Sequence, residues 1–253
     1  IPKGKKFQPI HPEEILNGGM PSICLGEVKN RSLWFKGYEQ TYLERDLREI
    51  SQVDNLMALR DLLHLTALRT GQLLSPSQLG RDAKLSAATT SRYLSLLATS
   101  FIITRLHPYL RNKASRIIKT PKLYLNDSGL ACYFAGLDKF GPPSGEPLMG
   151  PLFETYVAQN LRNIIDSVWP EGHLFFWTIQ GRQEVDFIIE AGRSCLALEI
   201  KWGAKWQERD LAGLKAFLSS TPHCKAAVLG YNGGDAVQLG EKLWALPISL
   251  ILS

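Results

Sequence analysis

Residues 184–190 have the sequence Glu-Val-Asp-Phe-Ile-Ile-Glu, and residues 195–201 have the sequence Cys-Leu-Ala-Leu-Glu-Ile-Lys. Both runs are rich in apolar and β-branched residues, and a turn-forming Ala-Gly-Arg-Ser segment separates them. The pattern predicts an antiparallel hairpin. Because side chains alternate between the two faces of a strand, Glu199 and Lys201 are expected on one face, with Asp186 within reach on the partner strand.

A helical pattern precedes this hairpin and contributes a third carboxylate. Gly150 and Pro151 open the pattern, and its apolar residues recur at helical spacing. At about 100° per residue, Glu154 falls inside the apolar stripe and is expected to point inward. An ionised carboxylate in apolar surroundings is unfavourable unless a metal, a cation or hydrogen bonds compensate it. A metal ion is the first candidate for Glu154, Asp186 and Glu199.

The residue types indicate the chemistry of such a site. Carboxylate oxygens from Asp186 and Glu199, a main-chain carbonyl and water make an oxygen-rich environment that suits Mg²⁺ or Mn²⁺. Such an ion polarises a phosphodiester and helps to generate hydroxide from bound water. Lys201 would stabilise the negative charge that develops on the phosphate. The sequence therefore suggests metal-dependent phosphodiester hydrolysis.

The same residues resemble the PD-(D/E)XK arrangement of restriction-endonuclease-like proteins, which include archaeal Holliday junction resolvases. Asp186 and the triplet that begins at Glu199 are separated by 12 residues, and Glu154 precedes them on a helix. The resemblance implies metal ligation by Asp186 and Glu199, catalytic support by Lys201 and an accessory carboxylate at Glu154. Val185 stands where the family often has proline. The alternative is structural: a same-face ion pair between Glu199 and Lys201, with Asp186 accepting backbone hydrogen bonds.

Composition limits the classes of protein that fit. With 253 residues, 45% of them hydrophobic, the chain can form one large core or two moderate ones. A segment dense in proline and glycine favours two domains, so we predict a linker at 1–48, a winged helix-turn-helix domain at 49–137, a second linker at 138–150 and a restriction-endonuclease-like α/β domain at 151–253. Dispersed cysteines and the lack of a signal or transmembrane pattern favour a cytoplasmic protein.

The predicted helix-turn-helix rests on three helical patterns, at 52–70, after Pro76 and at 87–98, followed by strands at 101–106 and 117–125. A net charge of +5 suits a polyanionic partner. In a DNA-binding interpretation, the outer face of the third helix offers Thr89, Thr90, Arg92 and Ser95 to a major groove. The loop between the strands would act as a wing whose cations contact phosphates, namely Arg111, Lys113 and Arg116. The alternative is a winged helix that packs against protein.

The whole chain also resembles the C-terminal half of prokaryotic AAA-type ATPases of uncharacterised role. The resemblance rests on four segments: Tyr-Leu-Glu-Arg-Asp-Leu-Arg at 42–48, Arg-Thr-Gly-Gln-Leu-Leu at 69–74, Pro-Lys-Leu-Tyr-Leu-Asn-Asp-Ser-Gly-Leu at 121–130 and Phe-Glu at 153–154. It implies an ATPase domain ahead of this chain. Because no G-x-x-x-x-G-K-[S/T] segment exists here, ATP would bind only in that missing domain.

Three functional hypotheses follow. The first is a metal-dependent nuclease that acts on DNA. The second is a noncatalytic, nucleic-acid-binding or regulatory half of an ATPase. The third is a module that binds another protein, including its own ATPase domain. A divalent ion between Asp186 and Glu199 would favour the first, and salt-sensitive DNA binding without cleavage would favour the second.

Overall fold

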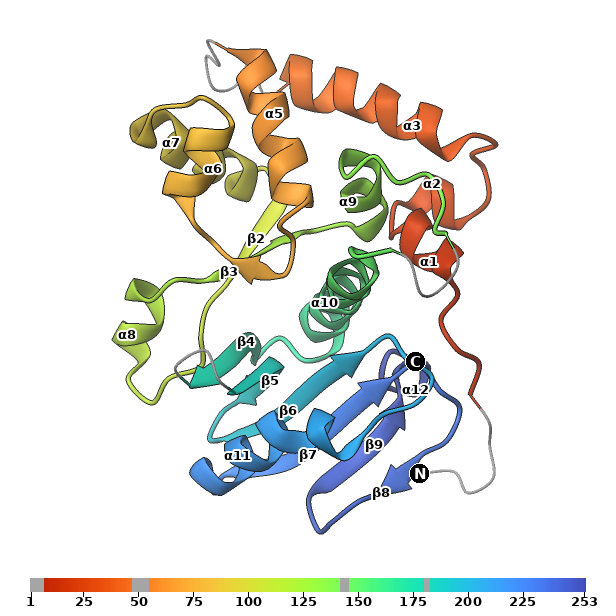
Figure 1. The fold of residues 1–253 in the computed structure, drawn as a ribbon, viewed down its shortest axis with the longest axis vertical. Coiled ribbons are helices and arrows are strands. Elements are labelled where there is room, and N and C mark those ends of the chain that lie inside the picture. The colour runs from red at the N-terminus through yellow and green to blue at the C-terminus, as the bar shows by residue number, and fades with distance from the viewer. Residues whose placement is uncertain (1–6, 47–54, 142–145, 180–182) are drawn as a thin grey trace. The chain divides into compact units, whose positions relative to one another are not determined.

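The computed structural model describes residues 7–46, 55–141, 146–179 and 183–253 (Figure 1). These residues form a mixed α/β fold with two compact units. The helical unit contains residues 12–105 and 122–159, and the C-terminal unit contains residues 106–121 and 160–253 together with the chain up to His11. Helix α10, Met149–Val168, contributes residues to both units. Parts of the predicted 1–48 linker and the start of the helix predicted at residue 52 lie outside the described residues.

The helical unit combines helices with a three-stranded sheet. Its sheet has the order β1-β3-β2, with β1 antiparallel to β3. The elements in chain order are α1 (Pro12–Asn17), α2 (Pro21–Cys24), α3 (Arg31–Tyr38), the π-helix η1 (Glu39–Asp46), α5 (Leu56–Ala67), β1 (Gln72–Leu73), α6 (Pro76–Asp82), α7 (Ala87–Thr99), β2 (Ile103–Leu106), β3 (Lys122–Leu125) and α9 (Ser128–Phe134). The predicted succession of helix, short helix, turn and helix is thus present in α5, α6 and α7.

Helix α7 begins where its sequence predicts. Ser86 adopts an extended conformation, and its hydroxyl accepts a hydrogen bond from Thr89 N at 3.1 Å. This side-chain cap satisfies one of the backbone donors that the first turn leaves without a partner. The helix buries Tyr93, Leu94 and Leu97. The apolar periodicity also predicts Ala88 on this inner face, but Ala88 is exposed.

The residue two positions after the end of α7 has unusual backbone geometry. Phe101 has φ of 58°, in the left-handed region that favours glycine, and its side chain is 78% exposed. We expect Phe101→Gly to raise the free energy of unfolding by about 0.5–1 kcal/mol, since it relieves a left-handed penalty of about 1–2 kcal/mol at some entropic cost. Urea denaturation would measure the change. Phe101→Ala, which removes the ring but keeps Cβ, is the control, and a glycine variant less stable than that control would contradict the prediction.

The C-terminal unit is built on a six-stranded sheet with the order β4-β5-β6-β7-β9-β8. The strands are β4 (Gly172–Ile179), β5 (Gln183–Ala191), β6 (Ser194–Lys201), β7 (Cys224–Tyr231), β8 (Val237–Gln238) and β9 (Leu243–Pro247). Strands β4, β5 and β6 are antiparallel neighbours, whereas β7 runs parallel to both β6 and β9. The predicted hairpin at 184–201 is therefore confirmed as β5 and β6.

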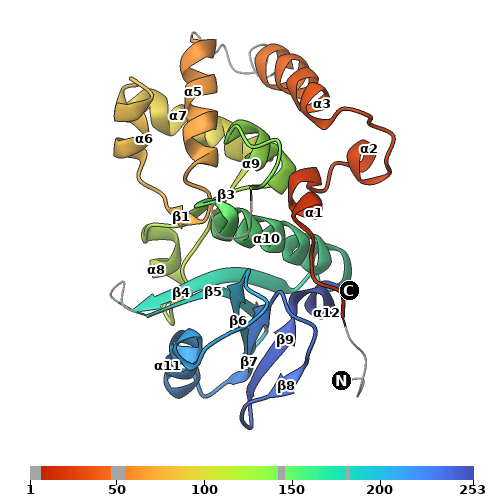
Figure 2. The same ribbon diagram turned by 45° about the vertical axis from the view of Figure 1, so that its right-hand side comes forward.

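One face of this sheet carries its main core. The 3₁₀ helix η2 (Glu208–Leu211) leads into α11 (Ala212–Ser220), which packs against β5, β6 and β7 (Figures 1 and 2). Leu214 and Phe217 of α11 are fully buried in this core. The helix approaches the sheet closely, because a Cβ atom added at Gly213 would lie 2.0 Å from the carbonyl oxygen of Glu184. Glycine at position 213 therefore sets the distance between α11 and β5.

Two predicted strands are wrong in part. The isoleucines at 117 and 118 belong to helix α8 (Lys113–Ile118), where Asn112 Oδ1 accepts a hydrogen bond from Ala114 N at 3.0 Å and so caps the helix. The apolar run at 243–252 also predicts a strand, but β9 stops at Pro247, and α12 (Ile248–Ile251) follows. A local cap in the first case and a proline in the second outweigh the β-propensity of the isoleucines.

Candidate functional site

Asp186 lies at an irregularity of β5. In the pairing of β4 with β5, Phe175 is opposite Ile188 and Trp177 is opposite Val185, so one residue of β4 faces two residues of β5. This is a β-bulge, a feature that redirects side chains near functional sites. The ladder between β5 and β6 ends close by, at the pair Phe187 and Leu198.

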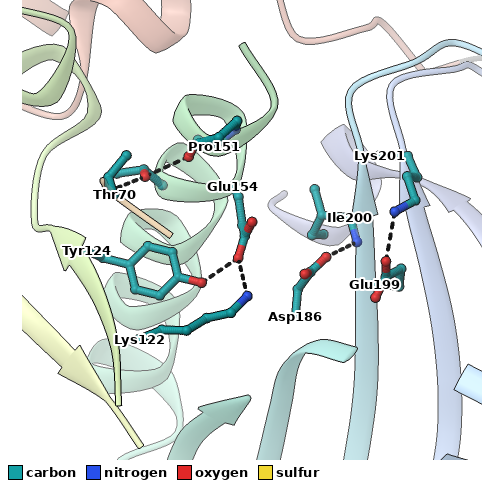
Figure 3. A network of polar contacts seen from close by, with 10 residues as sticks. Thr70, Lys122, Tyr124, Pro151, Glu154, Asp186, Glu199, Ile200 and Lys201 are labelled. Carbon is teal, nitrogen blue, oxygen red and sulfur yellow. Dashed lines mark hydrogen bonds and ion pairs between the residues drawn. The ribbon is translucent and has the colours of Figure 1, made fainter. Parts of the chain in front are cut away.

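Where the backbone hydrogen bonds between β5 and β6 end, the Asp186 carboxylate takes the place of a backbone acceptor. Its Oδ2 accepts a hydrogen bond from Ile200 N at 2.8 Å (Figure 3), and the residue is only 9% exposed. Backbone N–H donation to a carboxylate is one of the ordinary ways to stabilise a buried charge. Asp186 therefore fixes the end of β6 that carries Glu199 and Lys201.

Glu199 and Lys201 project to the same side of β6, as their spacing predicts. Lys201 Nζ donates to Glu199 Oε1 at 2.8 Å (Figure 3), and the two side chains are 36% and 12% exposed respectively. Desolvation lowers the pKa of Lys201, but the charges of Glu199, Asp186 and Asp210 outweigh it, so the net pKa is raised. The ammonium group thus stays protonated at neutral pH. It can stabilise negative charge but is a poor general base.

The oxygen donors of this site are of the type that a hard divalent cation prefers, but they are few. Asp186 and Glu199 are oxygen donors on neighbouring strands, which fits Mg²⁺ or Mn²⁺. Across the part of the chain that the structure describes, no group of three or more His, Cys, Asp or Glu side chains is placed to hold a metal. Any such ion would therefore be bound by two carboxylates, and main-chain oxygens and water would complete its coordination.

Glu154 points inward, as its helical phase predicts, and it meets β3 of the helical unit. Lys122 Nζ lies 3.0 Å from Glu154 Oε1, and the hydroxyl of Tyr124 donates to the same oxygen (Figure 3). The Lys122 and Glu154 side chains are only 5% and 17% exposed. The charge that suggested a metal is therefore compensated here by a buried ammonium and a phenol.

The candidate DNA-reading face of α7 is smaller than predicted. Arg92 and Ser95 are exposed and Thr89 is half-buried. Thr90 is fully buried, and its hydroxyl donates to Ser86 O at 2.8 Å. The prediction that Thr90 faces outward is wrong, because it shares the helical phase of the buried Tyr93, Leu94 and Leu97.

The predicted wing also differs from expectation. Arg111 and Lys113 are exposed, but helix α8 begins at Lys113, and this stretch belongs to the C-terminal unit. Arg116 is 6% exposed, and its two terminal nitrogens donate to the Glu190 carboxylate at 2.6 and 3.0 Å. A guanidinium used in this way cannot also contact phosphate. The prediction that Arg116 binds nucleic acid is therefore wrong.

Two groupings could not be found from the sequence. Tyr109 donates its backbone N–H to Phe176 O at 2.6 Å, and its hydroxyl lies 2.8 Å from His223 Nε2. Cys195 and Cys224, which are far apart in sequence, are register partners on β6 and β7, and both are buried. Only tertiary structure brings these residues together.

Comparisons with known proteins place this chain in a family without an assigned function. The chain belongs to the family described as a domain of unknown function, DUF8612, whose model matches residues 10–140. A second model, also described as a domain of unknown function, DUF4143, matches residues 149–251.

Two mycobacterial proteins are similar in sequence. The uncharacterized proteins Mb2031c of Mycobacterium bovis and Rv2008c of Mycobacterium tuberculosis are each 28% identical to this chain over 187 residues, which is 74% of this chain and 42% of each relative. The chain thus spans less than half the length of these relatives. A solved complex of Thermococcus gammatolerans McrB AAA+ hexamers with bound McrC covers 75% of this chain and 46% of its own chain at a TM-score of 0.31 and 12% identity.

None of the described helices is both long and apolar enough to cross a membrane.

Proposed function

We propose that the C-terminal unit is a metal-dependent nuclease module that hydrolyses phosphodiester bonds in DNA. The observation that carries this proposal is the placement of Asp186, Glu199 and Lys201 at the point where β5 and β6 stop pairing. There, a carboxylate on each strand and a protonated ammonium gather beside a β-bulge. Two carboxylates and a lysine in this order also carry the resemblance to restriction-endonuclease-like proteins.

Residues of this chain would have different roles in this reaction. Asp186 and Glu199 would hold a Mg²⁺ or Mn²⁺ ion, which supplies Lewis acidity and a metal-bound nucleophile when present. Lys201 would place positive charge where the phosphate becomes more negative. The Ile200 backbone, donating to Asp186, would orient that carboxylate. Lys201 would have to exchange part of its contact with Glu199 for contact with the substrate.

We also infer that the module works beside an AAA-type ATPase domain, which would bind ATP. The sequence segments at 42–48, 69–74, 121–130 and 153–154 support this inference by resemblance. The mycobacterial relatives, which are more than twice as long as the matched region, leave room for a further domain.

Cleavage assays test the nuclease directly. Labelled linear, single-stranded and branched DNA would be incubated with the chain and either Mg²⁺ or Mn²⁺. We expect cleavage that falls by at least about 100-fold in Asp186→Ala and in Lys201→Ala, the size of effect seen when one electrostatic catalytic group is removed. Asp186→Asn, which keeps an acceptor for Ile200 N, separates loss of charge from loss of the hydrogen bond.

The chain offers a matched control pair on the same unit. Glu208 and Lys215 also form an ion pair, but both side chains are more than half exposed. Glu208→Ala and Lys215→Ala should leave cleavage unchanged. If all variants cut as wild type does, the activity comes from another site or a contaminant, and the assignment of Asp186 and Lys201 is wrong.

A noncatalytic DNA-binding or protein-binding role is the second candidate. The observation in its favour is that Glu154 is paired with Lys122 and Tyr124, while Asp186 and Glu199 already accept hydrogen bonds from the protein. In this case DNA binding would persist in Asp186→Ala, and no substrate would be cut with either metal.

A further inference from the structure

We propose that α8 and the residues that flank it form a surface of the C-terminal unit that binds the phosphate backbone of double-stranded DNA. This inference rests on the proposed action on DNA, and it names where the substrate is held. The surface consists of Arg111, Lys113 and Lys119, with Ile117 and Ile118 between the last two cations. It is distinct from the α7 face.

The segment that leads into this surface is fixed to the sheet. Tyr109 N donates to Phe176 O at 2.6 Å and Phe176 N donates to His107 O at 3.1 Å, so residues 107–109 extend the edge of the sheet beyond β4. Paired backbone in this form holds the start of the segment in one conformation. The backbone that carries the cations after this segment would lose little conformational freedom on binding.

Arg116 holds α8 against the C-terminal unit. Its terminal nitrogens bind Glu190, its Nε donates to Leu110 O at 2.6 Å, and its guanidinium lies over the rings of Tyr109 and Phe175 at 4.6 and 4.5 Å. All of its faces are occupied by protein. Arg116 is thus a positioning residue that anchors the middle of α8 and leaves the helix's other side chains outward.

The side chains that remain exposed on this surface are positively charged or apolar. Arg111, Lys113 and Lys119 are exposed, and no Asp or Glu occurs between Pro108 and Asn126. Ile117 and Ile118 are 75% and 83% exposed. Glu190 lies near Lys113, but its carboxylate is paired with Arg116. The remaining cations are complementary to phosphates, which supply most of the affinity of sequence-independent binding. The isoleucines can contact sugars or the floor of a minor groove.

Helix α7 offers little positive charge of its own. Between Ala87 and Thr99, Arg92 is the single basic residue. One cation cannot account for strong electrostatic binding, because each phosphate contact contributes separately to affinity and to its dependence on salt. If the chain binds DNA, most of the binding free energy must therefore come from elsewhere.

The test is duplex binding by the whole chain, with Ca²⁺ in place of Mg²⁺ to avoid cleavage. A labelled duplex of about 30 base pairs would be titrated by fluorescence anisotropy between about 50 and 200 mM salt, the range over which phosphate contacts change affinity most visibly. We expect the triple variant Arg111→Ala, Lys113→Ala, Lys119→Ala to bind at least about 10-fold more weakly at low salt. The slope of log affinity against log salt should fall by about 3, near one unit for each cation.

A matched control removes the same charge elsewhere. Lys36→Ala, Lys139→Ala and Lys225→Ala are also exposed positions, and this triple variant should keep the wild-type salt slope. Equal losses in both triple variants would reduce the effect to net charge and overturn the proposal. So would wild-type protein that does not bind the duplex.

Anionic vesicles distinguish a membrane from DNA. The exposed isoleucines next to cations also fit a lipid surface, so vesicles of phosphatidylserine and phosphatidylcholine are the competing probe. We expect wild type and Ile117→Ser, Ile118→Ser to bind these vesicles no more tightly than vesicles of phosphatidylcholine alone. The proposal would be overturned if the Ile117→Ser, Ile118→Ser variant lost binding to anionic vesicles while the triple cation variant bound the duplex as wild type does. If the chain binds the duplex through these cations but does not cleave DNA, the proposed nuclease activity is wrong and the proposed binding surface stands.

Discussion

Arg116→Ala is expected to lower the free energy of unfolding by about 3–5 kcal/mol, the loss seen when one partner of a buried ion pair is removed. The Arg116 and Glu190 side chains are only 7% and 14% exposed, and two hydrogen bonds join them. Alanine would leave the Glu190 carboxylate without its main counterion and would remove the stacking on Tyr109 and Phe175. Urea denaturation followed by circular dichroism would measure the change.

Two controls separate charge from position. Arg116→Met combined with Glu190→Leu removes both charges with similar volume, and such replacements are often neutral, so we expect stability within about 1 kcal/mol of wild type. Lys215→Ala breaks the exposed pair with Glu208 and should change stability by at most about 0.5 kcal/mol. If Arg116→Ala behaves like Lys215→Ala, the pair is not the anchor of α8.

The same pair predicts how stability responds to acid. Hydrogen bonds from Arg116 lower the pKa of Glu190, although desolvation opposes them. Because the carboxyl pKa is lower in the folded chain than in the unfolded chain, its stabilising contribution is present above the ordinary value of about 4.3 and is lost as the pH falls toward the folded pKa. Glu190→Gln should therefore flatten the acid limb of the stability curve between those two values.

Periodicity and local signals predicted most of the elements that position the site. The hairpin of β5 and β6 followed from two apolar runs around a turn, and the start of α7 followed from Ser86. Each of these features depends on residues close together in sequence. The face shared by Glu199 and Lys201 also followed, since a strand has a period of two.

Some errors came from signals that were present but outweighed. Thr90 lies three, four and seven residues before Tyr93, Leu94 and Leu97, which is the spacing of a buried face. Its polarity suggested an outward role, but a hydroxyl that bonds its own helix can be buried. Asn112 is likewise a visible helix cap, and it predicts α8 better than the isoleucines predict a strand.

Other features had no local signal. Arg116 and Glu190 are 74 residues apart in sequence, and nothing near either residue specifies the other. The same holds for Cys195 and Cys224 and for the pairing of Tyr109 with Phe176. The sequence correctly predicts that the buried carboxylates of Glu154 and Asp186 need a group that compensates their charge. Which group provides it, a metal, a lysine or a backbone N–H, depends on contacts that only the fold determines.

Glu154→Ala is expected to destabilise the helical unit by about 3 kcal/mol or more, since it removes the carboxylate that pairs with the buried Lys122 and accepts from Tyr124. Lys122→Met combined with Glu154→Gln should recover much of the loss, because no unbalanced charge is then buried. Thermal and urea unfolding of the single and double variants would give the coupling between the two residues.

Glu154→Gln distinguishes this structural role from an accessory catalytic one. Glutamine keeps an acceptor for the Tyr124 hydroxyl, so the variant should stay folded with a loss of about 1–2 kcal/mol. If Glu154 acts only through its contact with Lys122 and Tyr124, metal-dependent cleavage by this variant should remain within a few-fold of wild type at a temperature where both are folded. Cleavage that falls about 100-fold in a folded Glu154→Gln would instead assign this carboxylate to the nuclease, because a structural loss of that size would be visible as unfolding.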